Sequence, residues 1–252
     1  MNKQEALFKY ILRIADNNLV LGHRLSEWTG RGPMLEEEMA LCNMALDLLG
    51  QANALLQYAA QVEGKGRTED DLAYLRNDRD FYNTLLAEQP NGDWAFTIAR
   101  QFLTDTFDFY FYDELRKSAD HTLAGIAAKA HKEATYHLRH SSAWTERLGD
   151  GTEESHQRMQ RAIHELWRFT DELFEMNEVD DILLREKVAV DLRGVKTKWN
   201  QKVDEVLAAA TLQRPDNVFM QRGSREGIHT EHLGHLLAEM QHLHRTHPGV
   251  KW

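Results

Sequence analysis

The sequence has little cysteine and proline, and it lacks long uninterrupted apolar runs. Its 252 residues include one cysteine, Cys42, and four prolines. A single cysteine excludes an internal disulfide and is compatible with a reducing compartment. No apolar run approaches the ~20 residues that span a bilayer, and Met1 leads directly into an amphipathic pattern rather than the apolar core of a signal peptide. We therefore expect a soluble, cytoplasmic protein that does not enter a membrane.

Positive charge is also scarce. Lysine and arginine number 30 against 40 acidic residues, which gives a formal charge of −10. The basic residues are scattered, so no electrostatic footprint for nucleic acid is present. The chain also lacks a glycine-rich phosphate loop, a Cys-x-x-Cys pair and a serine or cysteine nucleophile motif. We expect neither nucleic acid nor a nucleotide to be bound by a standard motif.

The sequence is instead rich in helical periodicity. Scarce proline and abundant Ala, Leu, Glu and Gln favour an all-α protein, and apolar residues recur at helical spacing. Four long helices with short connections are predicted, which is typical of a four-helix bundle; they span residues 4–29, 35–62, 94–116 and 122–148. Further helices are expected after Thr68, from Thr152 through Phe174, over 193–212 and over 230–245. Thr68 and Thr152 are the predicted N-caps of their helices, and Asp93 is the predicted N-cap of the helix over 94–116. We predict one domain, 1–252, with a core over 1–150 and additional helices of 151–252 packed on it.

His137 lies on the apolar stripe of the helix predicted over 122–148. A single histidine on such a face is most often a hydrogen-bonded core residue. A second stretch, on the helix predicted over 35–62, favours a functional origin for His137. In ferritin-like di-iron proteins two helices each supply Glu-x-x-His, and two others each supply one carboxylate. Here the corresponding stretches read Leu48-x-x-Gln51 and Ala134-x-x-His137, which indicates a metal site that has lost its ligands.

Two other stretches match Glu-x-x-His formally. Glu239 and His242 lie away from the apolar stripe of the last helix, among several C-terminal histidines, and a solvated polar face explains them better. Glu153 and His156 stand at a helix start, where acidic residues favour the positive end of the helix dipole. Neither pair is predicted to bind a metal.

Several longer strings carry a family resemblance. They include 47–52 (DLLGQA), 88–92 (EQPNG), 136–139 (YHLR), 166–170 (LWRFT) and 229–234 (HTEHLG). Together they resemble the C subunits of the bacterial ring-1,2-phenylacetyl-CoA epoxidases, the PaaC family, over essentially the whole chain. The resemblance implies a ferritin-like subunit that pairs with a related catalytic A subunit. That catalytic partner is implied to hold the di-iron centre and to epoxidise phenylacetyl-CoA, assisted by a small B subunit together with a reductase that uses NADPH, FAD and an iron–sulfur cluster.

Against the pattern of the catalytic subunits, this chain departs at the ligand positions. Leu48 and Gln51 stand where Glu and His would ligate, and Ala134 stands at the Glu position before His137. Asp105 matches the third-helix carboxylate, and Glu27 is the match for the first-helix carboxylate. Bridging carboxylates neutralise and join two irons, so the resemblance implies no metal and no catalysis in this subunit.

Two alternatives remain open at this stage. One is a ferritin-like di-iron oxygenase or iron-binding protein with an atypical ligand set. The other is a free-standing helical binding protein, and a homodimer is possible when the chain is alone. For the partner surface, the first three long helices are the candidates, because extra apolar residues lie outside their main stripes, among them Leu12, Leu19, Phe107 and Phe111. Because a buried charge needs a partner, Asp105 and His137 are predicted to share one polar network, directly or through Gln51 or a buried water.

Overall fold

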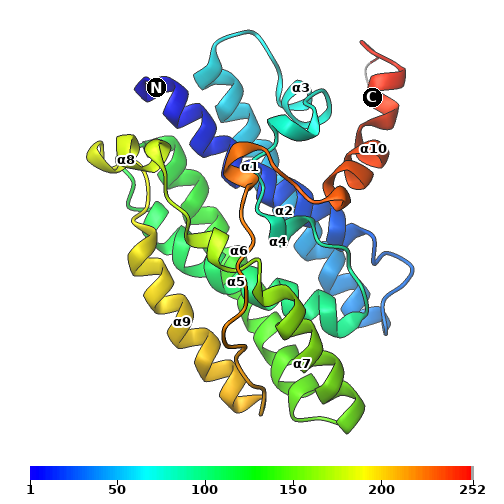
Figure 1. Ribbon diagram of the computed structural model, residues 1–252. Helices are drawn as coiled ribbons and strands as arrows, with labels where there is room; N and C mark the ends of the chain where they lie inside the picture. The colour runs from blue at the N-terminus through cyan, green and yellow to red at the C-terminus, as the bar shows by residue number, and fades with distance from the viewer. Residues whose placement is uncertain (251–252) are drawn as a thin grey trace. The chain divides into compact units, whose positions relative to one another are not determined.

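A computed structural model describes residues 1–250 of the chain (Figure 1). Its regular structure is helical, and no strand occurs in these residues. The all-α prediction is therefore confirmed. The chain divides into two compact units: Met1–Pro90 with Arg222–Trp252, and Asn91–Gln221. The prediction of a single domain with a boundary at residue 150 stays a prediction.

The first unit is built on two long helices, α1 (Lys3–Ser26) and α2 (Leu35–Glu63), which pack against each other along their length (Figure 1). Their close approach depends on Gly22, because a Cβ atom there would lie 2.9 Å from Cγ of Leu49. The shorter elements of this unit are α3 (Glu69–Tyr74), η1 (Asp78–Asp80), α4 (Leu85–Glu88), η3 (Ser224–Glu226) and α10 (Glu231–Thr246). Thr68 caps α3 as predicted, with its side chain accepting from the amide of Asp71.

The second unit pairs α5 (Trp94–Leu115) with α6 (His121–Gly149). Asp93 caps α5 through the amide of Phe96, as the sequence predicts. The remaining elements are α7 (Glu153–Trp167), η2 (Asp171–Phe174), α8 (Glu178–Arg185) and α9 (Leu192–Ala209), of which α7 and α9 pack on α5 and α6.

The predicted helix from Thr152 through Phe174 is wrong at its end. It stops at Trp167, and Phe174 belongs to the short 3-10 helix η2. There Phe174 packs edge-on against Phe107 and Trp199, with ring centroids 5.7 and 5.4 Å apart. Phe174 is apolar because its ring packs in the core, and not because it belongs to the apolar stripe of α7.

The prediction of the partner surface is wrong at the residues that it names. Leu12, Leu19, Phe107 and Phe111 are all buried, so they do not form a docking surface. The helical-wheel argument fails because α1 and α5 are buried around most of their circumference over long stretches. A residue outside the main stripe of such a helix is still a core residue.

α2 is long and apolar enough, by length and composition, to cross a membrane, and it is the one described helix that passes this test. The core helix of a soluble protein passes it as well, and 44% of the apolar window in α2 is buried. The apolar character of α2 therefore has two parts, a buried face toward the core and an exposed face.

Candidate functional site: the buried polar pairs of the long helices

The α1–α2 pair buries a neutral amide pair at one predicted ligand position. Gln51 is buried in α2, and its Oε1 accepts a hydrogen bond of 3.1 Å from Nδ2 of Asn18 in α1. Leu48, one turn earlier, is buried and apolar. Within this helix pair, the two predicted positions therefore offer one amide oxygen, already hydrogen-bonded, and no ionisable group.

Glu27 lies just beyond the C-terminal end of α1. Its side chain is 40% exposed and forms an ion pair of 2.9 Å with Arg24. It is nine residues beyond Asn18, which corresponds to about 13 Å along a helix. The α1 side chain that faces Gln51 is therefore Asn18, and the structure does not bring Glu27 to that level of the helix pair.

The α5–α6 pair brings Asp105 and His137 together. Both are 2% exposed. Burial raises the pKa of Asp105 from 3.8 to about 6, and the nearby His137 and a hydrogen bond with Ser141 oppose this rise. No hydrogen-bond partner is found for its buried Oδ2 among the described residues. His137 thus acts electrostatically on Asp105, and the prediction that the two share one polar network stays a prediction. Gln51 is bonded to Asn18 within the other unit.

The surroundings of this pair contain a further acid that the sequence reasoning missed. Asp108 lies one turn beyond Asp105 in α5, and burial together with the charge of Asp105 raises its pKa well above the usual value. Ala134, at the predicted position one turn before His137, is buried and contributes no ligand atom. The signal for Asp108 was its i, i+3 spacing from Asp105.

These residues do not fit a di-iron centre. Such a centre needs bridging carboxylates from the helices that also carry its histidines, and those positions here hold Leu48 and Ala134. Among the described residues, no three His, Cys, Asp or Glu side chains are grouped so that they could hold a metal ion. The misfit follows from the ligand types themselves, because neither an alkyl group nor an occupied amide can replace a carboxylate.

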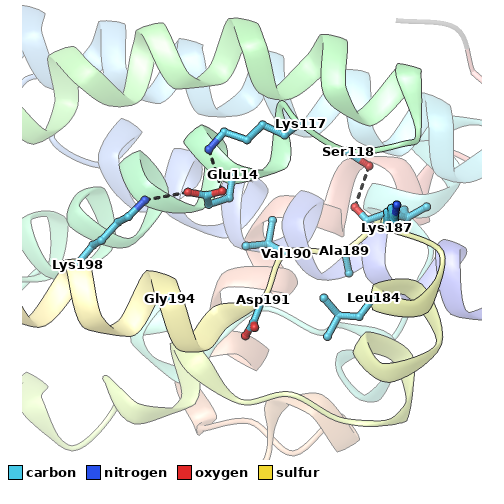
Figure 2. A pocket seen from close by; sticks show the side chains of 11 residues that line it. Glu114, Lys117, Ser118, Leu184, Lys187, Ala189, Val190, Asp191, Gly194 and Lys198 are labelled. Atoms are coloured by element: carbon cyan, nitrogen blue, oxygen red, sulfur yellow. Dashed lines mark hydrogen bonds and ion pairs between the residues drawn. The ribbon is translucent and has the colours of Figure 1, made fainter.

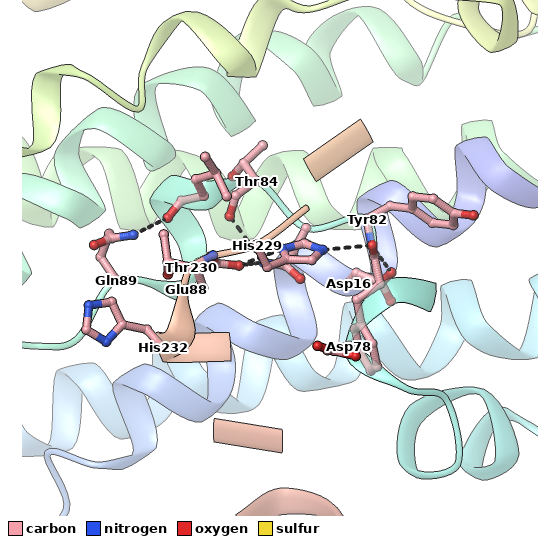
Figure 3. Close-up of polar contacts among 12 residues, drawn as sticks. Asp16, Asp78, Tyr82, Thr84, Glu88, Gln89, His229, Thr230 and His232 are labelled. Atoms are coloured by element: carbon pink, nitrogen blue, oxygen red, sulfur yellow. Dashed lines mark hydrogen bonds and ion pairs between the residues drawn. The ribbon is translucent and has the colours of Figure 1, made fainter. Parts of the chain in front are cut away.

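A second buried polar cluster lies elsewhere in the first unit, and Figure 3 shows it. Glu88 is fully buried; its Oε2 lies 2.8 Å from Nδ1 of His229, and its Oε1 accepts from the amide and hydroxyl of Thr230 at 2.6 and 2.8 Å. Nε2 of His229 lies 2.9 Å from the carbonyl of Phe81. This cluster joins the segment before α10 to α4 and its preceding loop, across 141 residues of sequence.

The C-terminal histidines thus have different surroundings. Glu239 and His242 are exposed, as predicted, but the side chain of His229 is only 3% exposed. The neighbouring Thr230 is the N-cap residue of α10, yet its side chain makes no capping hydrogen bond and binds Glu88 instead.

An ion pair reinforces the same region. Arg76 binds both carboxylate oxygens of Asp16, with Nη1 to Oδ2 at 3.0 Å, and both side chains are buried. The amide of Tyr82 donates to the same Oδ2 at 2.9 Å (Figure 3). This charge-assisted network holds the loop after α3 against α1, and it has no feature of a catalytic site.

A hollow in the second unit measures about 470 Å³ and is lined by residues of α5, α8 and α9 and the loop before α9 (Figure 2). Glu114 pairs there with Lys117 and Lys198 at 2.9 and 2.8 Å, and these lysines lower its pKa. The hydroxyl of Ser118 donates to the carbonyl of Val188 at 2.8 Å. Glu114 and the two lysines are therefore engaged with one another, and Ser118 is engaged with the backbone.

The relatives of the chain agree with this description of the fold. The family model for the phenylacetic acid catabolic protein, PaaA_PaaC, matches residues 1–252. The C subunit of the 1,2-phenylacetyl-CoA epoxidase of Escherichia coli (strain K12) is 51% identical over 246 residues, which covers 98% of this chain and 99% of the relative. These matches confirm the resemblance found in the sequence strings and, with the helical structure, the ferritin-like all-α fold class. The chain belongs to the phenylacetic acid catabolic protein family that these subunits define.

Proposed function

We propose that this chain is a non-catalytic, structural subunit of a multicomponent phenylacetyl-CoA epoxidase, acting in the cytoplasm in aerobic phenylacetate catabolism. Its relative in Escherichia coli is named as the C subunit of the 1,2-phenylacetyl-CoA epoxidase. The observation that carries the non-catalytic role is the chemistry of the ligand positions: Leu48 and Ala134 offer no ligand atom, and Gln51 is bonded to Asn18.

In this proposal the chemistry belongs to the partners. The catalytic A subunit holds the di-iron centre and the substrate, a small B subunit joins the assembly, and the reductase supplies electrons from NADPH through FAD and an iron–sulfur cluster. This chain contributes a folded helical surface that supports its catalytic partner. The α1 member of the vacated ligand set is Asn18 rather than Glu27, because Asn18 is the residue that faces Gln51.

The second candidate is an iron-binding protein with an atypical ligand set. It draws on Asp105 and His137, which are buried together, and on His140, whose charge also acts on Asp105. One carboxylate on α5 and two histidines on α6 are a weak ligand set for two irons, because no bridging carboxylate joins the metals. The same experiment separates the two candidates.

The test measures iron in the chain purified aerobically from iron-replete cells, with the catalytic partner prepared in parallel as the positive control. We expect no stoichiometric iron and no epoxidation of phenylacetyl-CoA by the chain alone, with activity appearing only when the catalytic partner, the small partner and the reductase are added. The triple variant Leu48→Glu, Gln51→His and Ala134→Glu restores the missing ligand types, and we expect it to take up iron. Two irons per wild-type chain, retained after mild chelation, would end the proposal.

Co-purification tests the partner independently of iron. A tagged chain co-expressed with the catalytic and small partners is expected to retain the catalytic partner through size-exclusion chromatography. Recovery of the chain without that partner, under conditions where both are folded, would favour a free-standing helical binding protein.

A further inference from the structure

The string 136–139 (YHLR) in α6 contains two buried and two exposed residues. His137 and Leu138 are 2% and 7% exposed, so the packing of the fold accounts for them. Tyr136 is 49% exposed, and Arg139 is exposed as well. The packing of this chain gives no reason for an aromatic ring and a guanidinium group at these two positions.

Tyr136 and Arg139 share one face of α6 with Lys132, because the three residues are spaced by four and three positions. We call these three exposed residues the basic face of α6. Among the described residues, neither cation has a hydrogen bond or an ion pair, and the Tyr136 hydroxyl has no hydrogen bond. The Tyr136 ring lies 6.3 Å from those of His137 and His140, measured between centroids, and these contacts orient it on the helix. Tyrosine and arginine are enriched where interfaces are strongest.

This face is basic although the chain as a whole is acidic. Glu133 is the one acidic residue within 121–143, and it pairs with Lys129 at 3.4 Å. The charges of Lys132 and Arg139 are therefore not balanced by their own helix. The two residues are seven positions apart, which corresponds to about 10 Å along the helix axis. A complementary surface would carry two carboxylates at that separation, with an apolar slot between them for the ring.

The chemistry of the basic face favours an acidic protein over other occupants. Small molecules bind in concave sites, whereas one exposed helix face is convex. Nucleic acids and anionic membranes are repelled by a chain whose formal charge is −10. A second copy of this chain is also disfavoured, because a two-fold axis at Tyr136 would place Lys132 beside Arg139 of the copy, and like charges would then meet.

We propose that the basic face of α6 is a docking site for an acidic protein surface of the epoxidase assembly. Carboxylates of that surface pair with Lys132 and Arg139, and an apolar slot between them receives the ring of Tyr136. Exposed charges chiefly set the association rate and its salt dependence, whereas a central aromatic ring supplies much of the binding energy. The inference rests on the proposed function, because the partner is sought among the other epoxidase components.

Biolayer interferometry tests the proposal by measuring how the full chain binds the catalytic partner, the small partner and the reductase, separately and together. Each series is run at low and at high salt, because salt screens exposed charges. The double variant Lys132→Glu and Arg139→Glu reverses both charges of the face. Its control is Lys9→Glu with Arg185→Glu, which changes the net charge equally at two exposed cations on α1 and α8.

A second pair of variants tests the ring. Tyr136→Ala removes it from the basic face, and Phe219→Ala removes an 84% exposed ring outside that face. Circular dichroism and urea unfolding check that every variant keeps the fold of the wild type, so that a loss of binding reports on the surface.

We expect the wild type to bind at least one component, with a dissociation constant that rises with salt. At low salt this constant should rise at least about ten-fold, or about 1.4 kcal/mol, both in the double charge reversal and in Tyr136→Ala. The charge reversal should also remove most of the salt dependence, and the two controls should match the wild type.

Two kinds of failure are distinguishable. If the wild type binds and the variants of the basic face bind equally well, or lose no more than their controls, the inference is overturned and the proposed function stands. The same holds if wild-type binding does not depend on salt, because the partner surface is then not acidic. If the folded wild type binds none of the three components, the proposed function is overturned together with this inference.

Discussion

The α1–α2 and α5–α6 helix pairs both bury polar side chains where a di-iron relative would place ligands, but they do so with different chemistry. In α1–α2 the buried pair is Asn18 with Gln51, two neutral amides joined by a hydrogen bond. In α5–α6 the pair is Asp105 with His137, two ionisable groups, and Asp105 has a raised pKa. The free energy of a buried amide pair does not depend on pH, whereas that of a buried carboxylate does.

Under the proposal that these are vacated ligand positions, the two pairs differ in what a missing metal leaves behind. Replacing ionisable ligands by amides and alkyl groups leaves no charge to neutralise. Keeping a carboxylate and an imidazole leaves a charge whose cost must be offset by the neighbour. The α5–α6 pair keeps two ionisable groups. We therefore expect the free energy of unfolding to respond to pH, and to the loss of either partner, more strongly through this pair than through the α1–α2 pair.

The largest effect is expected from His137→Leu. The substitution keeps a side chain of similar volume but removes the group that opposes the rise in the pKa of Asp105. Breaking a buried pair in this way costs about 3–5 kcal/mol, so we expect a loss of up to that size in urea unfolding at pH 6.5, just above the pKa of Asp105. The loss should shrink at pH 5, because Asp105 can then bind a proton. An equal loss at both pH values would mean that the two groups do not interact through charge.

Asp105→Asn should cause the next largest change in the free energy of unfolding. At neutral pH we expect this variant to be more stable than the wild type. Below pH 3.8 Asp105 is protonated in the folded and the unfolded chain alike. Between 3.8 and about 6 only the folded chain holds the proton, so wild-type stability falls as pH rises, by roughly 3 kcal/mol for a shift of about two units. Asp105→Asn removes this fall.

We therefore expect the stability difference between Asp105→Asn and the wild type to move in favour of the variant as pH increases from 4 to 7. Parallel stability curves for the two proteins would contradict the raised pKa. Gln51→Leu in the other helix pair is the control, and its difference from the wild type should be constant over the same pH range.

The sequence predicts local features of this fold better than contacts between distant segments. Thr68, Asp93 and Thr152 cap their helices as predicted, because capping depends on residues within one turn. The first helix was predicted to run to residue 29 because Leu25 and Trp28 continue the apolar stripe, although it ends at Ser26 and Glu27 is its C-cap residue. Periodicity alone does not show where a helix stops.

The same distinction between local features and distant contacts applies to the candidate sites. Asp105 and His137 were found from their positions on two predicted helices, and the structure places them together. The cluster of Glu88 and His229 was missed because it joins residues 141 positions apart, and no local pattern in the sequence marks that contact. The buried pair Asp16 and Arg76 was missed for the same reason, since the two residues are 60 positions apart.

The smallest change in the free energy of unfolding is expected for the neutral pair, Asn18 and Gln51. These variants test whether the α1–α2 pair is independent of pH. Asn18→Leu or Gln51→Leu alone leaves one buried amide without its partner, which costs about 1–3 kcal/mol. The double variant removes both polar groups and replaces them with apolar side chains, and such replacements can be nearly neutral. We expect the double variant to be more stable than either single variant in urea unfolding, with no dependence on pH between 5 and 8. If the two single losses simply add, Asn18 and Gln51 do not depend on each other, and the first helix pair is not the neutral counterpart of the second.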